Sequence, residues 1–343
     1  MIAHATVSSR LEADAFQRAN TIPECPSCSA QTLSPPLEKF HGSSLFACAS
    51  CDLHFWHPLK MPDYSHYEAA YQGRDHTAMP LEPGHRFFLA DPKAPKRGRL
   101  LDLGCGVGNF LAAARDAGFE VFGAEFNRNA VEFANKHYCL QSVFAATPEE
   151  LLAARPGEKF DVVTFFEVLE HQANPRPFLA TAREFLAPGG FLALSVPNRA
   201  RWQKGVETLD YPPNHLTRWS PRALVHFLRA NGFEILSLRE ERLGIRRAAQ
   251  VMSMALRSGL AARAAGGQPT TMADLLELPP AEMQQEIARL SQDPRQRWAA
   301  RLAHWKNLAM FPPAALALPF LRLRGYTGLY LYCLARLKHE AAN

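Results

Sequence analysis

The stretch Arg99-Leu-Leu-Asp-Leu-Gly-Cys-Gly-Val-Gly-Asn-Phe110 combines a short apolar run, an acidic residue and three glycines at alternate positions. This pattern predicts a buried strand that turns through a glycine loop into a helix. Glycine has no Cβ, so the backbone can turn sharply and a ligand can lie against its N–H groups at the start of the helix. The sequence therefore predicts a ligand-binding loop at Gly104, Gly106 and Gly108.

The spacing of these glycines separates two classes of ligand. A dinucleotide fingerprint has the form G-x-G-x-x-G, and its third glycine packs helix on strand above a pyrophosphate. Here the third glycine comes one position earlier, and Asn109 occupies the place of the fingerprint glycine. This disfavours a phosphate ligand. Asp102 and the three glycines instead resemble the first motif of the class I S-adenosylmethionine (SAM) methyltransferases, acid-x-G-x-G-x-G.

A second acidic residue supports a nucleoside ligand. Residues 119–125 are predicted as the next strand, and Glu125 ends it. In doubly wound sheets an acid at this position accepts both ribose hydroxyls, although alone it would be interpreted as a solvated strand-end residue. We therefore predict SAM as the cofactor. The residues expected to bind it are Asp102, Gly104, Cys105, Gly106, Gly108, Glu125, Phe126, Phe166 and Glu167.

Strand and helix patterns alternate over residues 99–240, which is typical of a parallel sheet. The resemblance implies an α/β fold, a Rossmann-like methyltransferase sheet of seven strands, with the seventh antiparallel and expected within residues 240–252. Ala187-Pro-Gly-Gly190 is predicted as a turn. The predicted strands are 99–103, 119–124, 141–145, 160–166, 191–196 and 233–239, and the predicted helices are 85–90, 110–117, 129–137, 148–154, 175–186 and 222–231.

The fourth predicted strand continues into Glu167-Val-Leu-Glu-His171, which resembles the E-V-L-E-H signature of a SAM methyltransferase group that includes the quinone O-methyltransferases. The carboxyl ends of parallel strands form the ligand crevice, so Phe166, Glu167 and His171 are expected near the sulfonium, whose charge an aromatic face stabilises. His171 is the second catalytic candidate. Alternatively, Glu170 and His171 only begin a helix and bind its open N–H groups.

The connection 199–220 contains Tyr211-Pro-Pro-Asn-His215, which resembles the P-P-x-H stretch of the same methyltransferases, where such a histidine faces the acceptor. Rigid prolines beside a histidine in a loop over a crevice favour the placement of a base. His215 is therefore the first candidate for the general base of a methyl transfer to a hydroxyl group. A packing histidine under the loop is the alternative.

Two C-x-x-C knuckles near the N-terminus predict a zinc ribbon. Each knuckle presents two thiolates from one tight turn, and two such turns complete a tetrahedral shell. A redox site of the thioredoxin type would need a single C-x-x-C beside a βαβ unit. Four protein ligands leave no open position, so the zinc is expected to be structural. The predicted ligands are Cys25, Cys28, Cys48 and Cys51.

These features divide the chain into five predicted parts. Tyr64, Tyr67 and Tyr71 lie on one face of a predicted helix, which either packs on the main domain or covers the cofactor. The parts are an N-terminal segment (1–20), the zinc ribbon (21–60), a linker with the tyrosine-rich helical lid (61–98), the SAM-binding domain (99–252), and a helical, basic and apolar extension (253–343).

The extension suggests contact with a membrane surface. Residues 307–321 carry no charge but contain three prolines, and arginines and an aromatic run follow them. This segment is too short and too broken by prolines for a spanning helix, so peripheral contact of residues 307–338 with anionic lipid is one of two equal expectations. The alternative is a hydrophobic helical pair packed on the domain or on a second subunit. Acidic residues within residues 1–20 disfavour a signal peptide, and we expect a cytoplasmic protein, peripheral at the inner face of the membrane if the lipid contact forms.

Methyl transfer is an in-line displacement that requires alignment and exclusion of water more than strong acid chemistry. We expect a SAM-dependent methyltransferase acting on a small molecule or glycan. A sugar, methylated on oxygen or carbon, is the first choice, because zinc-ribbon methyltransferases of similar build modify sugars. The alternatives are a quinone or lipid-linked substrate at the membrane surface, or a catalytically silent interaction module. Nucleic acid is disfavoured, because Lys39 is the only basic residue between Cys25 and Cys51. The sequence does not indicate an oligomeric state.

Overall fold

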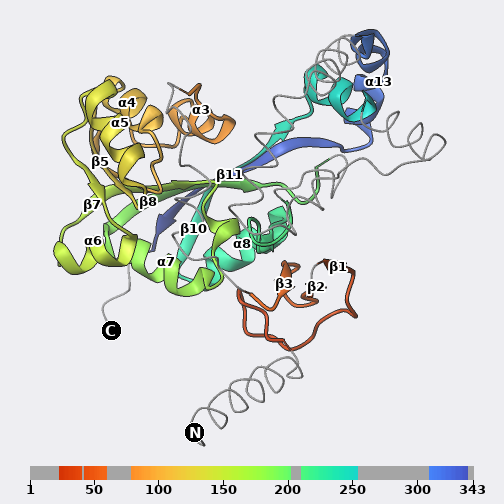
Figure 1. Ribbon diagram of the computed structural model, residues 1–343, viewed down its shortest axis with the longest axis horizontal. Helices are drawn as coiled ribbons and strands as arrows, with labels where there is room; N and C mark the ends of the chain where they lie inside the picture. Colours follow the sequence, from red (N-terminus) through yellow and green to blue (C-terminus); the bar gives the residue numbers. More distant parts are fainter. Residues whose placement is uncertain (1–22, 41, 60–78, 202–209, 254–308, 339–343) are drawn as a thin grey trace, which may run out of the picture.

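The computed structural model describes residues 23–40, 42–59, 79–201, 210–253 and 309–338 (Figure 1). The predicted N-terminal segment, the tyrosine-rich helix and the helices expected between residues 254 and 308 lie outside the described residues.

A seven-stranded sheet in the order β10-β11-β8-β7-β4-β5-β6 forms the centre of the molecule. Only β11 runs antiparallel to its neighbours β8 and β10, while β6, β5, β4, β7 and β8 pair in parallel. The strands are β4 (Gly98–Leu103), β5 (Phe119–Glu125), β6 (Val143–Ala145), β7 (Phe160–Phe166), β8 (Leu186–Pro197), β10 (Phe233–Arg242) and β11 (Thr327–Leu337).

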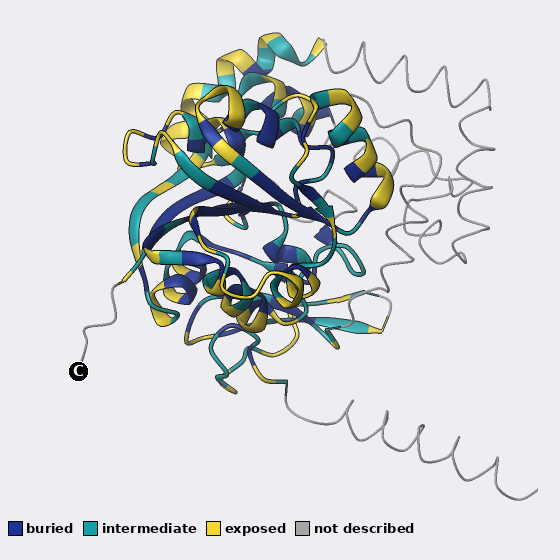
Figure 2. Ribbon diagram, turned by 90° about the vertical axis from the view of Figure 1, so that its left-hand side faces the viewer, coloured by how far each residue is buried: buried dark blue, intermediate teal, exposed yellow. Residues whose placement is uncertain are grey.

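Helices cover both faces of this sheet (Figures 1 and 2). Because both faces are covered, the central strand β4 is buried on both sides: Leu101 and Leu103 pack with one helical layer and Leu100 packs with the other. One layer consists of α3 (Pro83–Leu89), α4 (Asn109–Asp116) and α5 (Arg128–Tyr138). The other consists of α6 (Pro148–Ala154), α7 (Pro175–Glu184) and α8 (Pro221–Ala230).

The predicted helices and the first six predicted strands agree closely with these elements. Local signals explain the agreement at α8, where the Ser220 hydroxyl accepts a hydrogen bond from the backbone N–H of Ala223 at 3.1 Å and Pro221 occupies the first turn. Gly232 follows the helix in the left-handed region (φ 87°). The Ser–Pro start and glycine stop are typical of helix ends.

The expected position of the seventh strand is wrong. Strand β10 continues to Arg242 and residues 245–253 are helical, whereas the antiparallel strand is β11, in which Tyr332 pairs with Ser195 on one side and Arg239 on the other. The central residues of β11 are buried on both faces of the sheet. A short, continuous apolar run of this kind has no periodicity that separates a strand from a helix or a surface segment, so the sequence did not identify it as the seventh strand. The predicted boundary at residue 252 is therefore wrong for this segment, which completes the main sheet.

The position of β11 in the sheet reduces the number of residues that could form the predicted membrane contact. The central residues of β11, from Leu331 to Ala335, are fully buried and cannot face a lipid surface. Helix α13 (Phe311–Leu323) keeps Leu316 and Leu323 exposed, at 84% and 87%, so the predicted contact is restricted to α13 and the residues beside it. Over the described ranges, no helix combines the length and apolarity needed to cross a bilayer.

The turn predicted at residues 187–190 is also not a turn between elements. These residues lie within β8, where the register against β7 shifts after Phe160 and Gly189 has a φ of 70°. The glycines therefore accommodate an irregularity inside the strand.

A second, four-stranded sheet joins the N-terminal ribbon to the main domain. It has the order β1-β2-β3-β9, with β1 (Glu38–Phe40), β2 (Ser43–Ala47) and β3 (His54–His57) from the ribbon. The fourth strand, β9 (Thr217–Arg218), comes from the connection between β8 and α8 and pairs antiparallel with β3. The chain that follows His215 is thus part of the ribbon sheet.

The position of β11 predicts the effect of C-terminal truncation. Removal of residues 327–343 should expose the edges of β8 and β10 and abolish cooperative folding, because two rows of ladder hydrogen bonds and a buried apolar strand are lost. Removal of residues 339–343 alone is the matched control and should leave the melting temperature unchanged. Thermal unfolding followed by circular dichroism distinguishes the two, and a cooperative, unshifted transition in the longer truncation would contradict this topology.

Candidate active site

The glycine loop follows β4 at the carboxyl edge of the sheet. All three glycines have left-handed backbones, with φ values of 79°, 53° and 79° for Gly104, Gly106 and Gly108. A Cβ on Gly108 would lie 2.8 Å from Leu140 and 2.9 Å from Ala134, whereas a Cβ on Gly106 would meet none of the described atoms within 4 Å. Gly108 therefore allows close packing of α4 and α5, and Gly106 borders open space where a ligand can lie.

Glu125 lies against this loop. Its carboxylate accepts the backbone N–H of Gly106 at 3.0 Å through one oxygen and that of Asn127 at 3.0 Å through the other. Burial raises the pKa of Glu125, and these hydrogen bonds oppose the rise. A carboxylate can accept about four hydrogen bonds, so each oxygen keeps capacity for a hydroxyl. This arrangement suits the predicted ribose contact.

Asp102, on β4 directly before the loop, and Cys105, within the loop, both have buried side chains. The Thr164 hydroxyl donates to Asp102 at 2.7 Å, and burial raises the pKa of Asp102 to about 7. Cys105 is buried, and a Cβ on Gly123 of β5 would lie 2.7 Å from its sulfur. Cys105 can therefore contribute to the loop chiefly through its backbone.

Phe166 and Glu167 lie where β7 ends. The Phe166 ring contacts Phe110 and His85 edge-on, with centroids 4.9 and 4.8 Å apart. Glu167 adopts a φ of 54° and accepts the Ser195 hydroxyl at 2.7 Å, and burial raises its pKa to about 8. A non-glycine residue in this conformation is strained, and such strain is commonly found at functional sites. Phe126, which directly follows Glu125, is half-buried.

The two predicted catalytic histidines come together at the same edge of the sheet. Their rings are 5.0 Å apart, with His171 in the short 3₁₀ helix η1 (Leu169–His171) and His215 in the loop before β9. His171 Nδ1 lies 2.8 Å from the backbone carbonyl of Asn214, which can only accept, so this nitrogen carries the proton. Desolvation by burial lowers the pKa of His171 to about 4, so it is neutral at physiological pH.

Sequence reasoning missed Asp210 as a partner of His215. Asp210 Oδ1 lies 3.3 Å from His215 Nδ1, and Asp210 also forms a buried ion pair with Arg201. A carboxylate accepts, so His215 Nδ1 donates to Asp210, and in the neutral imidazole Nε2 is the nitrogen that can accept a proton. The geometry is that of an oriented base. An acidic residue five positions before His215 is visible in the sequence, but only the fold shows that Asp210 faces the histidine.

Glu170 was interpreted only as a possible cap, yet it lies between the two histidines. It is 1% exposed, and its Oε1 lies 3.8 Å from His171 Nε2 and 4.0 Å from His215 Nε2. Neither carboxylate oxygen has a hydrogen-bond partner among the described residues, and burial raises its pKa well above the ordinary value. Glu170 and the two histidines offer ligand atoms within 4.8 Å of one another, a set that could also hold a cation.

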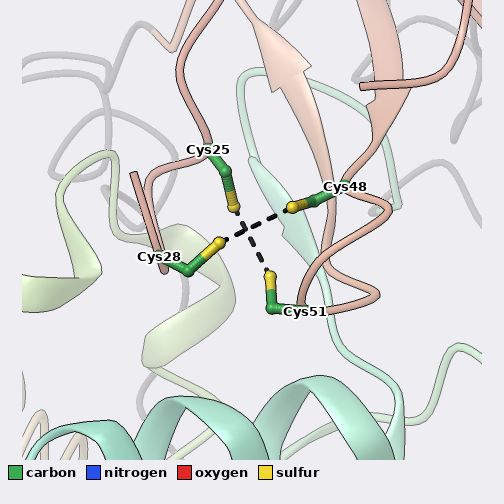
Figure 3. A group of neighbouring side chains, drawn as sticks. All are labelled: Cys25, Cys28, Cys48 and Cys51. Carbon is green, nitrogen blue, oxygen red and sulfur yellow. Dashed lines mark hydrogen bonds between the residues drawn. The ribbon is translucent and has the colours of Figure 1, made fainter. Parts of the chain in front are cut away.

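The four knuckle cysteines converge as a tetrahedral site requires (Figure 3). The Sγ atoms of Cys25 and Cys51 lie 3.6 Å apart, as do those of Cys28 and Cys48, close to the separation of about 3.8 Å that Zn–S bonds of about 2.3 Å impose. The hydrogen bond shared by the Cys25 and Cys51 sulfurs lowers the pKa of Cys51 to about 5 and raises that of Cys25. Four such sulfurs suit a structural zinc, which would occupy a closed shell.

Substitution at Gly106 tests the ligand position. Gly106→Arg should abolish SAM binding, since the side chain enters the open space beside the loop, while thermal stability falls only slightly. Gly157→Arg is the matched control, because Gly157 is also left-handed and borders open space in an exposed turn. Calorimetric titration with SAM measures the difference. Equal SAM affinity in the two variants would place the cofactor elsewhere.

The raised pKa of Asp102 predicts a pH-dependent stability. In the folded chain its pKa is about 7, compared with an ordinary value of 3.8, so the folded state binds this proton more tightly and the residue's contribution to the free energy of unfolding falls as pH rises from about 4 to about 7. Asp102→Asn keeps the acceptor for Thr164 and should gain stability relative to the parent, by a few kcal/mol at most, as pH rises from about 4 to about 7. Urea unfolding without SAM measures this, and a difference independent of pH would disprove it.

Comparison with known proteins agrees with this geometry. A family model described as a methyltransferase domain matches residues 73–238. Two proteins named ubiquinone biosynthesis O-methyltransferase are similar: that of Brucella anthropi is 35% identical over 141 residues, and that of Roseobacter denitrificans is 35% identical over 137. Each match covers 39% of this chain, and 56% and 54% of the respective relatives. The chain thus spans about half the length of these relatives.

A solved SAM-dependent methyltransferase from Archaeoglobus fulgidus overlaps 80% of this chain and all of its own, with 16% identity and a TM-score of 0.44. A likeness this low does not bear on the assignment, which rests on the family model and on the sheet with its glycine loop. Residues 73–238 therefore form a methyltransferase domain, whose glycine loop and Glu125 suit SAM, beside a four-cysteine ribbon suited to structural zinc.

Proposed function

We propose that this chain transfers the methyl group of SAM to a hydroxyl oxygen of an aromatic quinone precursor. The observation that carries the proposal is the Asp210–His215 pair, which directs Nδ1 of the imidazole to the carboxylate and leaves Nε2 as the nitrogen available to accept a proton. A hydroxyl acceptor needs such a base, because its proton must leave as the new bond to carbon forms. Amine acceptors have no such requirement when they bind as the neutral form.

In this proposal, one set of residues binds the cofactor and another removes the proton of the acceptor. Bound SAM supplies an electrophilic methyl group. The Gly106 backbone and the Glu125 carboxylate hold the nucleoside, and Phe166 lies at the end of β7 beside the strained Glu167. His215 Nε2 takes the proton of the acceptor hydroxyl, and Asp210 stabilises the resulting imidazolium. The acceptor oxygen gains the methyl group as the bond from that carbon to sulfur breaks.

The acceptor class differs from the first expectation. Sequence reasoning placed a sugar first and a quinone second, and the named relatives support the quinone alternative, with no similar support for a sugar. The silent interaction module has less support, because the open space at Gly106 and the hydrogen-bonded Glu125 are those of a working cofactor loop. A cytoplasmic location with contact through α13 would place the enzyme near a lipid-embedded precursor.

The proposal is tested with purified protein and isotopically labelled SAM. We expect methylation of aromatic diols that resemble quinone precursors, detected by product mass and S-adenosylhomocysteine release, and no methylation of nucleotide sugars. His215→Gln and Asp210→Asn should each reduce kcat by roughly 10²–10⁴-fold and leave the SAM dissociation constant nearly unchanged. Exposed His226→Gln on α8 is the control.

Methylation of a sugar with no turnover of any aromatic diol would refute the acceptor class. Full activity in His215→Gln would refute the base while leaving the cofactor assignment intact.

A further inference from the structure

We propose that the four-cysteine ribbon positions the general base His215. Glu38, Asp52 and strand β3 of the ribbon fix the loop of residues 210–219, which carries this histidine. This inference rests on the proposed function for the catalytic importance of His215. The mechanical coupling itself rests on contacts between ribbon and loop, which can be tested without an acceptor.

The ribbon binds the loop directly after His215. The backbone N–H of Trp56 donates to the carbonyl of Leu216 at 2.9 Å, and Phe55 and His54 pair with Thr217 and Arg218. Leu216, Thr217 and Trp219 are fully or almost fully buried. Leu216 is therefore hydrogen-bonded to the ribbon, and Thr217 and Arg218 form the fourth strand of its sheet.

The ribbon also binds the loop before His215. The Tyr211 hydroxyl donates to Glu38 Oε1 at 2.6 Å, and its ring packs against Phe40 and Trp56, with centroids 4.6 and 5.7 Å apart. Arg218 donates to Glu38 Oε2 at 3.1 Å. One carboxylate of β1 thus holds the chain on both sides of His215, which restricts the position of the imidazole.

A knuckle residue anchors both ends of the connection. Asp52, next to Cys51, accepts Arg199 at 2.5 Å and the Ser220 hydroxyl, while its own backbone N–H donates to the Cys48 carbonyl at 2.9 Å. Its left-handed backbone (φ 67°) belongs to the knuckle turn. The orientation of Asp52 therefore depends on the turn that the two thiolates close, and zinc ligation would stabilise it.

The opposite side of the loop contacts the catalytic machinery. Leu216 N donates to the carbonyl of Glu170 at 2.8 Å, and the carbonyl of Asn214 lies 2.8 Å from His171 Nδ1. The loop is thus held between η1 and the ribbon, and in the described chain β9 pairs only with β3. The cofactor residues on β4 and β5 lie outside this set of contacts. Loss of the ribbon's order should therefore release His215 without altering the SAM loop.

Hydrogen exchange with mass spectrometry tests the coupling on the full chain. Zinc content is measured first, and the metal is then removed with a chelator. We expect exchange in residues 211–219 to accelerate by roughly tenfold or more, while residues 99–125 stay protected and SAM affinity stays within about twofold. Cys48→Ser should reproduce the effect.

Three outcomes would overturn the proposal. Unchanged exchange in residues 211–219 after metal loss would show that the loop is held by the main domain alone. Equal acceleration in residues 99–125 would show that the ribbon stabilises the whole domain and not this loop. A chain purified without zinc but with a fully protected loop would remove the metal from the account.

A second variant separates positioning from general stability with the metal in place. Glu38→Gln keeps the side-chain shape but replaces one acceptor facing Tyr211 or Arg218 by a donor, and Lys39→Gln on the same strand is the control. Glu38→Gln should retain zinc and SAM affinity, accelerate exchange in residues 211–219, and lower kcat by roughly tenfold with little change in the KM for SAM. Glu38→Asp should recover part of the loss.

Exchange and kcat both equal to those of Lys39→Gln would disprove the role of Glu38. Failure of the parent chain to bind SAM would instead refute the proposed function, and the exchange experiment would still decide the coupling.

Discussion

Burial of strand β4 on both faces is the constraint on which the rest of the structure depends. Leu100, Leu101 and Leu103 are completely buried, and β4 pairs with β5 and β7, so the chain can leave the core only at the carboxyl edge. The glycines make that exit possible in a single tight turn. Four carboxyl groups also lie at this edge, and burial raises their pKa values. A cationic cofactor such as SAM would complement the charge of these groups.

Most of the fold could be predicted because local signals agree with the tertiary structure. Strand–helix alternation, the Ser220 cap and the glycine loop are short-range features, and each lies where expected. β11 could not be placed because its partners are remote in sequence: Tyr332 pairs with Ser195 across a long intervening segment. Its apolar character is equally compatible with a lipid-facing or core segment, and only the pairing decides between them.

The candidate site was predictable in its residue types and not in its partnerships. Motif spacing led to the glycine loop, Glu125, His171 and His215 as candidates, and the ring centroids of the two histidines lie 5.0 Å apart in the structure. Neither Asp210 nor Glu170 stood out, because a carboxyl group gains its role from burial and from the imidazole it faces. Likewise, the two knuckles predicted a metal site, whereas the pairing of β3 with β9 depends on the docking of the ribbon.

The most direct test of the central claim is a crystal structure of the chain with S-adenosylhomocysteine. The account predicts ribose hydroxyls on the Glu125 carboxylate, the nucleoside against Gly106, and the sulfur directed to the edge of the sheet that carries His171 and His215. A ligand bound elsewhere, or a sulfur remote from both histidines, would contradict the assignment of this edge as the methyl-transfer site.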